Sequence, residues 1–187
     1  MAFKNLSVES DPKWFLKDWN LSNSSTPCKW NGVICSGLGH VLGLNLSGAG
    51  LVGNLNMSNL IERLPNLAHV HFRGNFFYGN LSFLSTPDLS CSLGTLDLSA
   101  NNFFQPIEFG ALMLNCNRLR HLNLSSNRYL DDLSNLEFHS CGNLTVLDLS
   151  LLENRAKETS DSVSKPSLFV NWRRDGVGKH PTPFMRL

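Results

Sequence analysis

The feature that most constrains the fold of this chain is an internal repeat with a period of 25 or 26 residues. Five segments share one apolar pattern, and they begin at Val41, Leu67, Leu93, Leu119 and Leu144. Two further apolar columns keep the 26-residue spacing: Leu51, Phe77, Phe103 and Tyr129, then Leu55, Leu81, Ile107 and Leu133. Repeats of this length are typical of elongated proteins whose units stack side by side and bury one continuous core.

Each segment fits the pattern L-x-x-L-x-L-x-x-N, which is the leucine-rich-repeat signature. Its alternation predicts one short strand per repeat, at 43–46, 69–72, 95–98, 121–124 and 146–149. The predicted fold is therefore an α/β leucine-rich-repeat solenoid with a parallel β-sheet on its concave side. Short helices or 3₁₀ turns are expected on the convex side, at 56–64, 111–119 and 135–139. The alternative, an amphipathic helical repeat, does not explain the strict alternation.

An asparagine occupies the position where the chain leaves the strand in the three middle repeats, at Asn75, Asn101 and Asn127. An amide side chain there can bond backbone groups of its own turn and of the neighbouring repeat. The sequence therefore predicts a ladder of buried asparagines along one edge of the sheet.

Composition and motifs exclude several classes of function. The net charge of +1 does not favour binding to nucleic acid, and the longest apolar run, 111–114, is too short for a membrane span, which needs about 20 residues. The motif G-x-G-x-x-G at 48–53 matches a dinucleotide fingerprint, but the repeat explains its glycines. No catalytic or metal-ligand motif is present, so we expect no enzyme activity, no cofactor and no metal.

The residues that precede the repeats form a second pattern. They include Ser10-Asp11-Pro12, Phe15-Leu16, Trp19, Pro27-Cys28, Trp30, Gly32-Val33 and Cys35-Ser36. This pattern resembles the N-terminal cap of plant leucine-rich-repeat receptor-like kinases, with the brassinosteroid-receptor-like group the most similar. The resemblance implies a helical cap at 1–40 and about five repeats at 41–152. Residues 153–187 lose the repeat register, and we expect a disordered tail that leaves the last strand with an unpaired edge.

The resemblance also implies the state of the cysteines. Cys28 and Cys35 are expected to form a disulfide that staples the cap over the first repeat, since such a cap implies an oxidising compartment. Two free thiols are the alternative, and zinc is disfavoured because ligand spacing is lacking. The regular spacing of Cys91, Cys116 and Cys141 predicts three buried, unpaired repeat-core residues.

By the same resemblance, the chain is expected to be a non-catalytic protein-interaction module, an ectodomain fragment without the kinase domain. Its partner would be a protein or peptide on the concave face, with a co-receptor in the full-length family. The candidate contact residues form a mildly basic patch: His69, His71, Arg73 and His121. A merely solvated face is the alternative for this patch. The alternative for the whole chain is a secreted inhibitor of cell-wall hydrolases.

Location and modification follow from the resemblance as well. The extracellular side of the plasma membrane is expected, although the chain opens without the apolar stretch of a secretory signal. Eight N-x-S/T sequons occur, and a repeat rich in Leu, Asn and Ser generates some of them without function. The preferred glycosylation candidates lie in expected loops, at Asn20, Asn23, Asn56 and Asn80.

Overall fold

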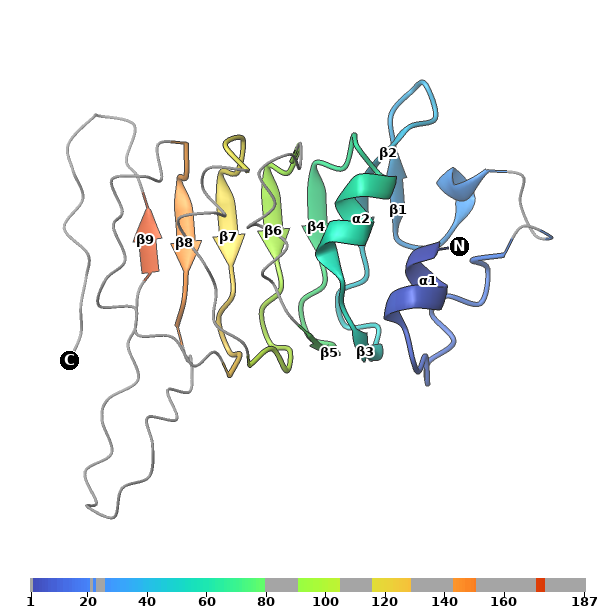
Figure 1. Ribbon diagram of the computed structural model, residues 1–187, viewed down its shortest axis with the longest axis horizontal. Helices are drawn as coiled ribbons and strands as arrows, with labels where there is room; N and C mark the ends of the chain where they lie inside the picture. Colours follow the sequence, from blue (N-terminus) through green and yellow to red (C-terminus); the bar gives the residue numbers. More distant parts are fainter. Residues whose placement is uncertain are drawn as a thin grey trace, which may run out of the picture.

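The structure of the chain is a computed structural model that describes residues 2–20, 22, 26–79, 91–104, 116–128, 143–150 and 171–173. Its helices are α1 (Ala2–Ser7), the 3₁₀ helix η1 (Pro27–Lys29) and α2 (Met57–Arg63). Its strands are β1 (Val33–Cys35), β2 (Val41–Asn45), β3 (Val52–Asn54), β4 (His69–His71), β5 (Phe76–Tyr78), β6 (Thr95–Asp97), β7 (His121–Asn123), β8 (Val146–Asp148) and β9 (Asn171–Arg173). Figure 1 shows one row of strands along the long axis, with α1 and α2 on one side of it.

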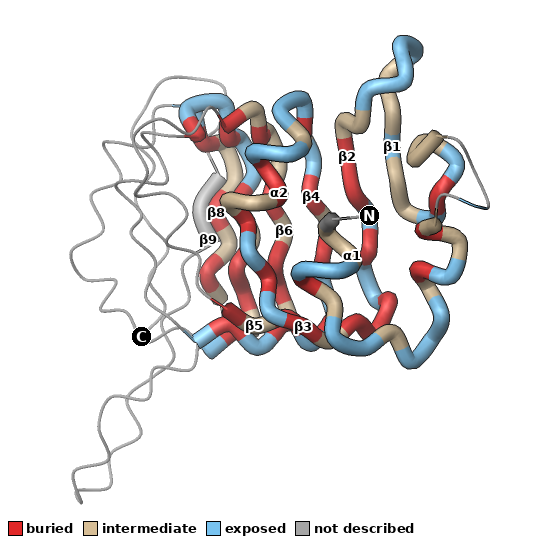
Figure 2. The backbone as a smooth tube through the Cα atoms, turned by 45° about the vertical axis from the view of Figure 1, so that its right-hand side comes forward, coloured by how far each residue is buried: buried red, intermediate tan, exposed pale blue. Residues whose placement is uncertain are grey.

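One large sheet runs through all the repeats in the order β1-β2-β4-β6-β7-β8-β9. The five repeat strands pair in parallel, and one register row joins Leu44, Val70, Leu96, Leu122 and Leu147. Every residue in this row is at most 2% exposed, and the buried stretches line up from strand to strand in Figure 2. The predicted parallel solenoid with one strand per repeat is therefore confirmed.

Both ends of this sheet carry antiparallel strands, which the repeat pattern does not predict. At one end β1 pairs with β2, so the cap adds a strand to the sheet. At the other end β9 pairs with β8, with Trp172 opposite Leu147. The expectation of an unpaired last edge is therefore wrong, because a short segment outside the repeat register bonds to that edge. The rest of 153–187 lies outside the described residues.

The cap is held by local hydrogen bonds and by an aromatic cluster. The carboxylate of Asp11 accepts from the backbone N–H groups of Phe15 and Leu16, at 2.8 Å each. Trp19 and Trp30 stack with ring centroids 5.5 Å apart, and both are buried. The expected disulfide between Cys28 and Cys35 is present, with a Cα–Cα distance of 5.6 Å. These contacts close the open end of the first repeat.

The cap also packs on a second, two-stranded sheet, in which β3 and β5 pair in parallel. A side chain on Gly53 of β3 would overlap the carbonyl oxygen of Ser7, so only glycine permits this close approach. Tyr78 of β5 donates a 2.5 Å hydrogen bond to the Glu9 carboxylate. This bond, together with partial burial and the negative charge of Glu9, raises the pKa of Tyr78 above its ordinary value.

The predicted asparagine ladder is confirmed. Asn75 Oδ1 accepts from the N–H of Leu51, and its Nδ2 donates to the carbonyls of Leu46 and Phe72. Asn101 and Asn127 repeat this arrangement one and two units further along. Each amide therefore joins its own turn to the preceding repeat, and all three are at most 6% exposed.

The turn that contains this ladder requires a left-handed backbone. Gly48 and Gly74 have φ angles of 67° and 69°, and the equivalent residues of the next two repeats, Ala100 and Ser126, have φ angles of 52° and 55°. Glycine adopts this conformation at no steric cost, whereas for a residue with a Cβ the conformation is less favourable by about 1–2 kcal/mol. The repeat geometry therefore overrides local preference at Ala100 and Ser126.

On the convex side, α2 begins at an N-cap formed by Asn56, whose Oδ1 accepts from the N–H of Asn59. It buries Met57, Leu60 and Ile61, so the helix predicted at 56–64 is confirmed. The segment 135–139 and most of 111–119 lie outside the described residues.

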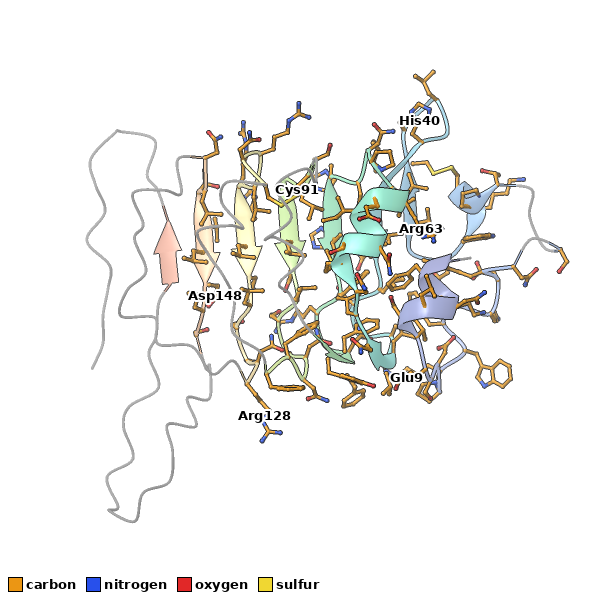
Figure 3. The ribbon with its side chains drawn as sticks, viewed as in Figure 1. Glu9, His40, Arg63, Cys91, Arg128 and Asp148 are labelled. Atoms are coloured by element: carbon orange, nitrogen blue, oxygen red, sulfur yellow. A yellow bond between two sulfur atoms is a disulfide. The ribbon has the colours of Figure 1, made fainter. Side chains whose placement is uncertain are left out.

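The expectation that Cys91 and Cys116 are unpaired is wrong. They form a disulfide with a Cα–Cα distance of 4.9 Å, and Figure 3 labels Cys91 beside β6. The 26-residue register of these two repeats aligns Cys91 with Asn117, so Cys116 lies one residue from the position directly across. Neighbouring strands lie about 4.8 Å apart, which is within the range that a disulfide spans. The regular spacing therefore brings these cysteines together instead of isolating them. Cys141 lies outside the described residues.

Candidate functional site

The concave face of the sheet carries two register rows of side chains that point away from the core. One row contains His69, Thr95, His121 and Val146, and the other contains His71, Asp97, Asn123 and Asp148. They flank the buried leucine row on both sides, because successive residues of a strand face opposite sides of the sheet. The two rows make a polar surface across four consecutive repeats.

A groove of about 310 Å³ lies on this surface. Its polar lining comes from β4, β6, β7 and β8 and consists of His71, Thr95, Asp97, His121, Asn123 and Asp148. Parallel strands lie about 4.8 Å apart, so the groove crosses the sheet at right angles to the strands.

Local hydrogen bonds fix the orientation of Asp97, Asn123 and Asp148 in the second row. Asp97 Oδ1 accepts from the backbone N–H of Ser99 at 3.0 Å and from its hydroxyl at 2.6 Å. Asp148 has the same pair of bonds to Ser150, at 3.0 and 2.7 Å, and Asn123 repeats the arrangement one repeat earlier. A partner that binds here meets side chains whose orientation is already set, so little conformational entropy is lost on binding.

Two of the four predicted contact residues, His71 and His121, line the groove. His69 lies in the same row as His121, and Arg73 follows β4 on an exposed position. The sequence analysis missed Asp97 and Asp148, although the repeated L-D-L-S motif marks both of them. Because Asp97 and Asp148 line the groove together with the histidines, its lining is not simply basic.

Two of the four glycosylation candidates can be placed. Asn56 is exposed at the start of α2, and its Oδ1 caps that helix. Asn20 is partly exposed, and its Nδ2 donates to the carbonyl of Lys17. Asn23 and Asn80 lie outside the described residues.

The described part of the chain contains neither a candidate metal site nor a candidate membrane span. Within it, no group of three or more His, Cys, Asp or Glu side chains is placed to hold a metal ion. Among the same residues, no helix has the length and apolar character needed to cross a bilayer.

Comparison with known proteins agrees with the cap and the solenoid. A family model described as "Leucine rich repeat N-terminal domain" matches residues 1–36, which include Cys28 and Cys35. The Arabidopsis thaliana protein "Receptor-like protein kinase BRI1-like 3" is 38% identical over 149 residues, which are 80% of this chain and 12% of that protein. The chain has a leucine-rich-repeat fold and is similar to the ectodomains of plant receptor kinases.

Solved structures of plant receptor ectodomains are similar to this leucine-rich-repeat domain. The crystal structure of PEPR1–AtPEP1 matches with a TM-score of 0.65 and 28% identity, over 79% of this chain and 20% of that one. The Arabidopsis receptor kinase HAESA, in complex with the peptide hormone IDA and the co-receptor SERK1, matches with a TM-score of 0.62 and 33% identity. That match covers 76% of this chain and 23% of HAESA.

Proposed function

We propose that this leucine-rich-repeat domain binds an extended peptide or protein segment on its concave face, as part of signal perception at the plant cell surface. The observation that carries the proposal is the groove of about 310 Å³ across four repeats, with polar walls fixed by hydrogen bonds. A groove perpendicular to the strands suits a ligand in extended conformation, because it offers equivalent contacts at each strand spacing.

The relatives support a peptide or protein as the partner. HAESA forms a complex with a peptide hormone and a co-receptor, according to the name of its structure, and PEPR1–AtPEP1 matches this chain with a similar TM-score. In this proposal the groove contacts the peptide, and other surfaces of the full-length receptor contact a co-receptor.

We infer that the chain is part of a receptor ectodomain and that it contributes binding and no phosphoryl transfer. The kinase domain of the relatives would then lie outside this chain, and the ectodomain would face the extracellular side of the plasma membrane. The relatives reported above are receptors, which favours this interpretation over a secreted inhibitor of cell-wall hydrolases.

Selection from a phage library of random nonapeptides tests the proposal directly. The immobilised, disulfide-bonded chain should enrich peptides whose binding is lost when His71 and His121 are both replaced by alanine. The matched control is Glu62→Gln, an exposed position on α2 of the convex side, which should leave binding unchanged. Enriched peptides that bind the double variant as well as the original chain would refute the concave site.

A further inference from the structure

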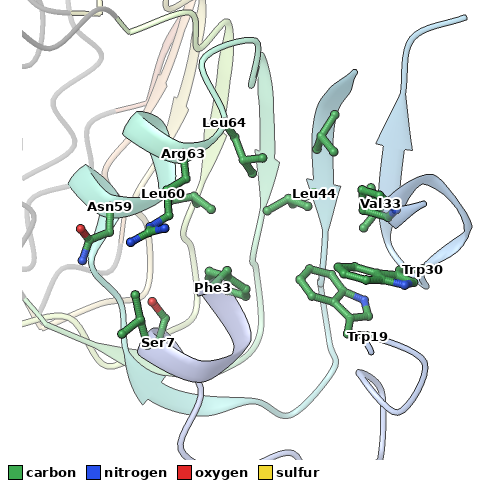
Figure 4. A pocket seen from close by; sticks show the side chains of 13 residues that line it. Phe3, Ser7, Trp19, Trp30, Val33, Leu44, Asn59, Leu60, Arg63 and Leu64 are labelled. Carbon is green, nitrogen blue, oxygen red and sulfur yellow. The ribbon is translucent and has the colours of Figure 1, made fainter. Parts of the chain in front are cut away.

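A second hollow lies between the cap and the first repeat, and it shares no residue with the concave groove. Its volume is about 400 Å³, which falls in the range of about 300–1,000 Å³ found for small-molecule sites. Figure 4 shows α1 and α2 on one side of this cavity and β2 with the two cap tryptophans on the other.

Most of the wall is apolar, and most of it is fixed in place. Trp19, Trp30, Leu44 and Leu60 are each at most 7% exposed, and Phe3 packs against the same core. Phe3 and Trp19 lie 5.9 Å apart, and Trp19 stacks on Trp30. Three aromatic rings therefore form a rigid wall, which suits a flat, ring-bearing molecule.

Three polar side chains gather at the opposite end of the cavity, where α1 meets α2. Ser7 is 3% exposed. Its oxygen points into the cavity in Figure 4. A hydroxyl on the cavity wall can donate a hydrogen bond to an anionic group that enters the cavity.

Asn59 and Arg63 lie next to each other along α2 and complete this polar end. Arg63 is the single charged residue among those that line the cavity, and no carboxylate in the described part of the chain pairs with it. A guanidinium, a hydroxyl and an amide form a suitable set of donors for one carboxylate, which an arginine can bind through two parallel hydrogen bonds.

We propose that this cavity binds a small ring-bearing carboxylic acid. The carboxylate bonds to Arg63, Ser7 and Asn59, and the ring lies against Phe3, Trp19 and Trp30. The apolar wall supplies most of the binding free energy, and the three polar groups set the orientation and select for the anion. This proposal does not depend on the function proposed for the concave face.

The probe for the test is naphthalene-2-carboxylate, paired with the neutral naphthalene-2-methanol. Calorimetric titration of the intact, disulfide-bonded chain should give an affinity for the carboxylate on the order of tenfold higher than for the alcohol. Arg63→Gln should remove this preference, whereas Arg118→Gln, a matched change at an exposed arginine outside the cavity, should leave it intact. Equal affinities for the two probes, or a preference that persists in Arg63→Gln, would overturn the proposal.

The indole N–H signals in a nitrogen-edited NMR spectrum locate the bound probe. The signals of Trp19 and Trp30 should shift on addition of the carboxylate, and the signal of Trp14, which is 75% exposed, should not. Ser7→Ala should weaken the carboxylate severalfold and leave the alcohol unchanged. If a protein segment fills the cavity in solution, the probe produces neither heat nor indole shifts, and that result also overturns the proposal.

Discussion

Replacement of Asn101 by alanine tests how the repeats are joined, because this residue makes four hydrogen bonds from one buried side chain. Its Oδ1 accepts from the N–H of Phe77 at 3.0 Å, and its Nδ2 donates to the carbonyls of Phe72, Leu98 and Ser99 at 2.9, 3.1 and 3.1 Å. The side chain is 6% exposed, so alanine removes these partners from a site that water hardly reaches.

The loss in free energy of unfolding depends on which backbone groups keep a hydrogen-bond partner in Asn101→Ala. Each of the three carbonyls retains a second donor: Asn75 Nδ2 for Phe72, Asn127 Nδ2 for Leu98 and the Gly74 N–H for Ser99. Among the described residues, the N–H of Phe77 has no second acceptor besides Asn101 Oδ1. The backbone bond toward β3 is made by the neighbouring residue, since the N–H of Phe76 donates to the carbonyl of Leu51. One orphaned buried donor costs about 1–3 kcal/mol, and the weakened carbonyl bonds add to it, so we expect a loss of about 2–4 kcal/mol.

Equilibrium urea unfolding followed by far-UV circular dichroism measures this loss. Asn102→Ala is the matched control: its side chain is exposed, and we expect a change within about 0.5 kcal/mol. The dependence on urea should stay the same in both variants, so that the midpoints report stability. If Asn101→Ala costs no more than Asn102→Ala, the ladder does not stabilise the solenoid and the reasoning fails.

Three further predictions concern other features. Ala100→Gly should stabilise the chain by about 0.5–1 kcal/mol in the same unfolding assay, because it relieves a left-handed φ; a loss of stability would contradict the strain argument. Mass spectrometry of a non-reduced digest should find the peptides of Cys91 and Cys116 joined and, after reduction, separate; two free peptides before reduction would contradict the bond. An absorbance titration should place the pKa of Tyr78 above 10.0, and Glu9→Gln should lower it. Since the raised pKa means that the bond stabilises the protonated phenol, its contribution to folding is complete below pH 10 and is lost as the pH rises through the folded-state pKa.

The repeat period allowed much of the fold to be predicted from sequence. Stacking of equivalent units fixes the strand positions, and it places Asn75, Asn101 and Asn127 at equivalent turns where their amides bond the preceding unit. The same logic, carried one step further, predicts contact between Cys91 and Cys116. The spacing of these cysteines is compatible both with buried free thiols and with a bond between neighbouring repeats, and the structure has the bond.

The remaining features follow from contacts that a repeat pattern does not encode. Pairing of β1 and β9 with the ends of the sheet needs only free edge groups and no sequence register. The cavity beside α1 lies between the cap and α2, and the sequence does not show that Ser7 and Arg63 line one cavity. The sequence shows the repeat position of Asp97, but only the stacking of the strands shows that its side chain shares a row with His71.

The antiparallel pairing at β8 has a consequence for any extension of the solenoid. The backbone donors and acceptors along that edge already bond to β9, so they are not available to a sixth parallel strand at the same time. The two pairings are mutually exclusive, and a further repeat has to displace β9 before it can join the sheet. Segment 171–173 and a sixth parallel strand would therefore compete for the same backbone groups of β8.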